Sequence, residues 1–151
     1  MYMTLFMYTA ATAIVFGGIY SAFAAKDPSR FKMWFVAYTV LIVGVFQLGI
    51  AYWWQQLSPV LVMSGVIALG LYNIGNILVI AGRYYKHTSS HALSLVRTGG
   101  ALLAIAMIIL IYTSWSEPFT FARWCLIIAA VVIMISMLIG LVLSARKSQK
   151  D

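Results

Sequence analysis

The chain has very few acidic residues. Its 151 residues hold three Asp and Glu against ten Lys and Arg, and charged residues make up only 9% of the total. Soluble domains carry charge at roughly a quarter of their positions, because polar groups must cover the surface in water. The scarcity of charge therefore excludes an ordinary soluble domain and a disordered tail. With 64% hydrophobic residues, the composition predicts an integral membrane protein.

The residue patterns of common catalytic and metal centres are also missing. A single cysteine, Cys125, excludes an intrachain disulfide. The chain has no paired carboxylates, no Ser-His-Asp arrangement and no Cys/His cluster with zinc spacing. His87 and His91 stand four apart and are weak metal candidates, but they lie in a polar stretch without further ligands nearby. We therefore expect no enzymatic activity, no metal and no cofactor.

What the chain does have is long uncharged runs. Charge is absent from residues 1–25, 33–82, 98–116 and 124–145. A bilayer core takes about 20 residues of helix, so the second run is long enough for two helices, with a polar turn at 55–59. A spanning segment must satisfy its own backbone, which favours helix. The sequence predicts an all-α single domain over residues 1–151, a compact bundle of five transmembrane helices at about 4–25, 33–54, 60–82, 98–115 and 124–144.

The basic residues predict the orientation. With five spans, nine of the ten fall on one side of the membrane and Arg123 alone falls on the other. Basic loops stay in the cytoplasm, so we expect an outside N-terminus and a cytoplasmic C-terminus, in a prokaryotic cytoplasmic (inner) membrane. We therefore expect the basic residues behind the net charge of +7 to contact lipid head groups rather than to bind nucleic acid. The predicted head-group contacts are Lys26, Arg30, Lys32, Arg83, Lys86 and Arg97.

Uncharged polar residues inside the predicted spans mark a candidate site. The predicted cluster comprises Gln47, Tyr72, Asn73 and Asn76. Asn73 and Asn76 share one helix face because they lie three residues apart. Amides in hydrocarbon need partners, which leaves two interpretations open. The favoured one is hydrogen bonding between helices, worth about 0.5–2 kcal/mol each, and the other is a cavity for an uncharged polar or amphipathic ligand. Thr9 and Thr39 add further hydroxyl groups to the first two spans.

The spans contain no ionisable side chain of the kind that proton-coupled carriers keep in the membrane. The leading hypothesis is therefore a non-enzymatic accessory or scaffold subunit that packs against a membrane-protein partner or its own copies. One alternative is a small transporter, channel or lipid-handling protein with an uncharged polar cavity in spans one to three. A third, an immunity or defence-type membrane protein, fits the size alone. The expected partners are the lipid bilayer and either a membrane protein or a homo-oligomer.

Overall fold

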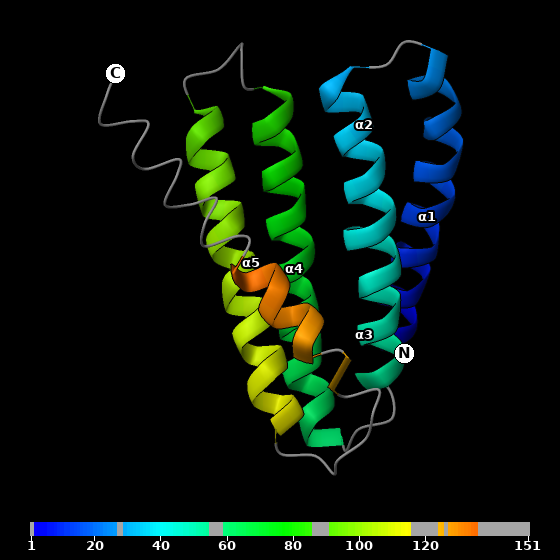
Figure 1. Ribbon diagram of the computed structural model, residues 1–151. Helices are drawn as coiled ribbons and strands as arrows, with labels where there is room; N and C mark the ends of the chain where they lie inside the picture. Colours follow the sequence, from blue (N-terminus) through cyan, green and yellow to red (C-terminus); the bar gives the residue numbers. More distant parts are fainter. Residues whose placement is uncertain are drawn as a thin grey trace. The chain divides into compact units, whose positions relative to one another are not determined.

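The described part of the chain is helical and contains no strand. The computed structural model describes residues 2–26, 29–54, 59–85, 91–115, 124–125 and 127–135. Its elements are α1 (Tyr2–Lys26), α2 (Arg30–Ala37), the π-helix η1 (Tyr38–Phe46), α3 (Gln47–Trp54), α4 (Pro59–Tyr84) and α5 (Ala92–Trp115) (Figure 1). Residues 127–135 are helical as well. The prediction of an all-α fold is confirmed.

Four of the predicted spans match helices that are long and apolar enough to cross a membrane. These helical stretches are Met3–Lys26, Arg30–Trp54, Leu61–Tyr84 and Ala92–Thr113. The fourth begins at Ala92 rather than at residue 98, because an apolar stretch before Arg97 continues the helix beyond the charge that marked the predicted end. The predicted fifth span is helical over 127–135, and its residues 136–144 lie outside the described residues.

The second span is one continuous rod made of α2, η1 and α3. Ser29 has an extended backbone and caps the rod, its side chain accepting a hydrogen bond from the Lys32 amide at 3.2 Å. Tyr38–Phe46 is a π-helix, a form whose backbone hydrogen bonds span one residue more than those of an α-helix. This stretch holds several β-branched residues and a glycine, which have lower α-helix propensity. Such a wide turn is rare and accommodates extra chain between two regular helices.

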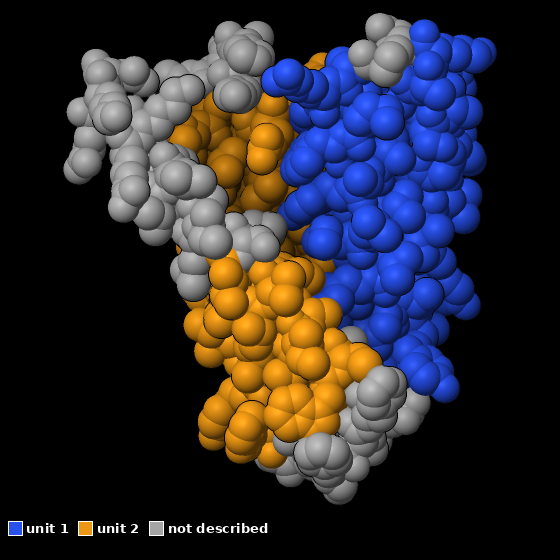
Figure 2. All heavy atoms as spheres, viewed as in Figure 1, with its two compact units in different colours: residues 1–69 blue, residues 70–151 orange. Residues whose placement is uncertain are grey.

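The structure divides into two compact units, coloured separately in Figure 2. Unit 1 comprises Met1–Leu69 and unit 2 comprises Gly70–Asp151. In unit 1, α1 and the rod are antiparallel neighbours: the Tyr20 and Phe35 rings pack edge to face at 5.4 Å near one end, and Gln47 bonds to the start of α1 at the other. The buried core of unit 1 is built mainly from small and apolar residues, including Ala10, Ile50, Ala51 and Trp54.

Unit 2 is organised around a close approach of α4 and α5. A Cβ atom on Gly75 would lie 2.9 Å from the carbonyl oxygen of Gly99, and one on Gly99 would lie 2.6 Å from that of Gly75. Nearer the helix ends, a Cβ on Gly82 would lie 2.6 Å from the carbonyl oxygen of Ala92. The two backbones therefore touch at glycine positions, as small residues allow in apolar helix packing.

Trp54 connects the rod to the first turns of α4 within unit 1. Its ring is fully buried, and its indole Nε1 donates a hydrogen bond to the carbonyl oxygen of Leu61 at 2.8 Å. Trp54→Phe removes this bond and leaves a void, so we expect it to lower the free energy of unfolding by about 1–3 kcal/mol. Trp53→Phe, at the half-buried neighbour, is the control and should change it by less than about 0.5 kcal/mol. Reversible unfolding in mixed micelles measures both, and equal losses would contradict the assignment.

Candidate functional site

Gln47 is the best-defined polar side chain of unit 1. It is the first residue of α3 and is completely buried. Its Nε2 donates to the carbonyl oxygen of Phe6 at 3.0 Å and to Oγ1 of Thr9 at 2.7 Å, and this Oγ1 donates to the same carbonyl at 2.9 Å. The Phe6 carbonyl can only accept, so chemistry fixes which end of the Gln47 amide faces α1. The three groups form a closed polar contact between α1 and α3.

Among the described residues of unit 1, two buried oxygen atoms have no hydrogen-bond partner. These are Oε1 of Gln47 and Oγ1 of Thr39, whose residue is 6% exposed. A buried polar group left in this state costs about 1–3 kcal/mol. Thr39 lies in η1 and Gln47 directly after it, so both atoms belong to the irregular part of the rod. Each atom retains the capacity to bind a small polar molecule.

The other members of the predicted cluster belong to unit 2. Tyr72 and Asn76 are buried at 1% and 2% exposure, and Asn73 is half-buried on the same helix, α4. The predicted cluster is thus divided between the two units, with Gln47 alone in unit 1. A common site for all four stays a prediction. Thr9, which lies outside the predicted cluster, is the residue that the structure places against Gln47.

The basic residues of the described chain lie close to helix ends. Lys26 is the last residue of α1, and Arg30 and Lys32 lie in the first turn of α2. Arg83 is the penultimate residue of α4 and Arg97 lies in the second turn of α5, whereas Lys86 falls outside the described residues. These positions are compatible with the predicted head-group contacts, which stay a prediction.

His91 is exposed at the start of α5, and His87 lies outside the described residues. Over the ranges that the structure describes, no three His, Cys, Asp or Glu side chains lie close enough to hold a metal ion. Cys125 is a free, exposed cysteine.

A double-mutant cycle measures the contact between α1 and α3. Gln47→Leu removes the hydrogen bonds from Nε2, which lowers stability. It also removes the unpartnered Oε1, which raises stability, so the single variant does not measure the bond alone. Combining it with Thr9→Val isolates the bond, and we expect a coupling energy of about 0.5–2 kcal/mol. The matched control pairs Gln47→Leu with Thr12→Val, because Thr12 is exposed one turn further along α1. The control pair should show additive effects, and coupling of equal size in both pairs would refute the assignment.

Comparison with protein-family models, with curated proteins and with solved structures finds no match for the chain.

Proposed function

We propose that the protein is a non-enzymatic membrane subunit that packs its helices against a membrane-embedded partner or against its own copies. The observation that carries the proposal is the position of Gln47. Its side chain is fully buried, and its amide nitrogen donates two hydrogen bonds to α1. An amide that lined a ligand cavity would keep those donors for the ligand. Interhelical hydrogen bonding is instead the common use of Gln in transmembrane helices.

Large apolar side chains that remain exposed support insertion in a membrane. On α1 they include Leu5, Val15 and Ile19, each about 60% exposed, and on α4 Ile67 and Ile77 at 54% and 65%. In water such faces would promote aggregation. In a membrane they contact lipid or a partner helix, where apolar side chains are stable. The proposed orientation puts the α1–α2 and α4–α5 connections, with their basic residues, in the cytoplasm.

Mass measurement of the protein in lipid nanodiscs tests the proposal. We expect a complex of fixed stoichiometry, either several copies of this chain or a constant ratio with one other membrane protein. A monomer at all protein-to-lipid ratios, with no co-purifying chain, would refute the subunit function. Labelling of Ser29→Cys in a Cys125→Ala background tests the orientation, because a membrane-impermeant thiol reagent should reach it only in inside-out vesicles.

The unpartnered oxygens of Thr39 and Gln47 favour a second candidate function, a small transporter or lipid-handling protein with an uncharged polar site beside the rod. A hydrogen-bond donor such as water or a hydroxylated ligand would give both oxygens a hydrogen-bond partner. Gln47→Cys and Thr39→Cys variants, both in the Cys125→Ala background, separate the two functions. If the protein is a transporter, both thiols should react with a small water-soluble methanethiosulfonate in intact membranes. If it is a packing subunit, neither thiol should react.

A further inference from the structure

Three cationic residues gather at one end of unit 1. Lys26 ends α1, and Arg30 and Lys32 lie in the first turn of α2. Lys26 and Arg30 are exposed and Lys32 is half-buried. Among the residues of unit 1 that the structure describes there is no Asp or Glu, and the sequence supplies one carboxylate nearby, Asp27. Counted along the sequence from residue 26 to residue 32, three positive charges against one negative charge leave an excess of two.

The start of α2 adds to this positive potential. The N-terminus of a helix carries a partial positive charge, which proteins usually offset with Asp or Glu in the first turn. Here the first turn of α2 has no acidic residue and instead contains Arg30 and Lys32. The Ser29 cap holds the turn in place through the Lys32 amide. The cations and the helix end therefore favour a bound anion at the same location.

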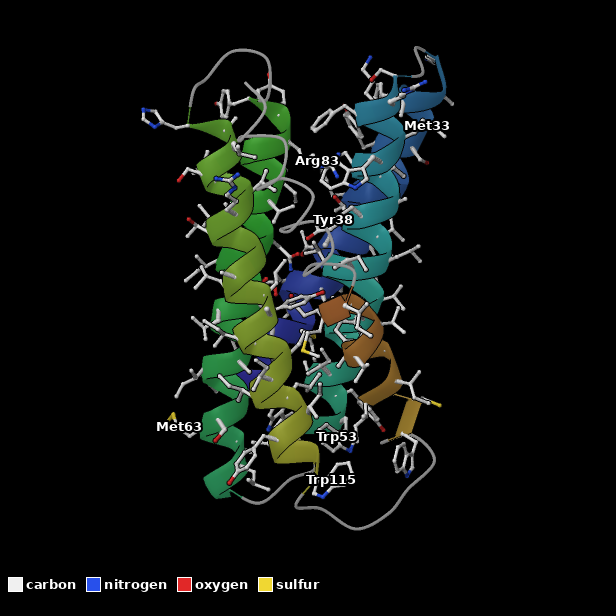
Figure 3. All side chains as sticks on the ribbon, turned by 60° about the vertical axis from the view of Figure 1, so that its left-hand side comes forward. Met33, Tyr38, Trp53, Met63, Arg83 and Trp115 are labelled. Carbon is white, nitrogen blue, oxygen red and sulfur yellow. The ribbon has the colours of Figure 1, made fainter. Side chains whose placement is uncertain are left out.

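Aromatic residues neighbour the cationic residues along the sequence of α2. On α2 the Phe31 and Trp34 rings are 5.9 Å apart, and Trp34 stacks on Tyr38 at 4.8 Å. The Phe35 ring continues the contact across to Tyr20 on α1 at 5.4 Å. Met33 and Tyr38, which are labelled in Figure 3, lie on the same part of the rod. Rings of this kind, which include Trp and Tyr, suit the boundary between head groups and acyl chains.

We propose that this end of unit 1 binds the phosphate head group of an anionic phospholipid. Lys26 and Arg30 supply the charge, and the adjoining rings offer an apolar surface to the glycerol and the first acyl carbons. An inorganic phosphate ion would use the cations alone, whereas a phospholipid uses both parts of the surface. The inference rests on the proposed membrane insertion and names the lipid class that the protein selects.

Native mass spectrometry of the full chain, released from nanodiscs of phosphatidylcholine and phosphatidylglycerol, tests the site. We expect retained phosphatidylglycerol to exceed its share of the bilayer. Lys26→Gln/Arg30→Gln should weaken that retention by roughly 30-fold, since each basic group near an anionic surface contributes about one kcal/mol. Lys147→Gln/Lys150→Gln removes the same charge from the C-terminal tail and should leave retention unchanged. Equal retention in both double variants, or no preference in the wild type, would overturn the proposal.

Two further arms separate the outcomes. Adding millimolar inorganic phosphate should not displace the lipid, and full displacement would assign the site to free phosphate. Extraction of the protein from membranes by alkaline carbonate would refute membrane insertion and with it the proposed function. Resistance to carbonate without lipid preference would refute the lipid site alone.

Discussion

Gly99→Ala is expected to lower the free energy of unfolding by about 2–4 kcal/mol, one of the largest effects of a single methyl group in this protein. The new Cβ would lie 2.6 Å from the carbonyl oxygen of Gly75 and 2.9 Å from the Val79 amide nitrogen. Both obstacles are backbone atoms, which cannot rotate away as a side chain does. The substitution therefore forces α4 and α5 apart and weakens the contacts along both helices.

Gly70→Ala is the matched control on α4. A Cβ at this position would meet no described atom within 4 Å. Alanine has the higher helix propensity, so we expect Gly70→Ala to be neutral or to stabilise by up to about 1 kcal/mol. Unfolding in mixed micelles, followed by circular dichroism, measures both variants. A Gly99→Ala protein as stable as Gly70→Ala would show that the α4–α5 backbones do not touch.

Deleting Leu41 from η1 is expected to leave the protein folded, with a change in stability of about 1 kcal/mol or less, comparable to an ordinary surface substitution. The side chain is 59% exposed, so little packing is lost. The π-helix carries more residues per turn than an α-helix, and removing one lets the segment return to ordinary i to i+4 hydrogen bonding. The flanking helices α2 and α3 then keep their faces toward α1.

The same deletion in a regular helix should have the opposite result. Val15 is equally exposed, at 61%, but lies within α1. Its removal rotates one half of α1 by about 100° relative to the other. The Phe6 and Thr9 contacts with Gln47 and the contact of Gly17 with Val40 then cannot form together. We expect the Val15 deletion to abolish folding, as judged by loss of monodisperse protein in gel filtration. Similar behaviour of both deletions would contradict the π-helical assignment.

Much of the fold could be predicted because it follows from local properties of the chain. The ends of the first three helices agree with the predicted spans to within a few residues, since charged and polar residues mark where apolar helix stops. The irregular middle of the second span could not be predicted in this way. Tyr38–Phe46 is as apolar as its flanks, and hydropathy does not distinguish a π-helix from an α-helix.

The candidate site could be predicted only in part. Gln47 stands out in an apolar span, and the sequence supports the expectation that it needs a partner. That the partners are Phe6 and Thr9 depends on the rotation of α1 and α3 about their axes. That Oγ1 of Thr39 is buried without a partner likewise depends on how the rod packs against its neighbours. No local pattern around Thr39 sets it apart from other hydroxyl residues of the spans.

The sequence by itself determined that the chain is helical and which stretches are long and apolar enough to cross a membrane, because charge and hydropathy are read along the chain. The tertiary structure decided which faces meet: Gln47 of α3 contacts α1, and Gly99 of α5 lies against Gly75 of α4. It also decided that a π-helix joins α2 to α3. The physical reason is that these helices are apolar on every side. A soluble helix shows which face is buried through its polar face, whereas a uniformly apolar one does not. Gly70 and Gly99 are therefore alike in sequence and opposite in their surroundings.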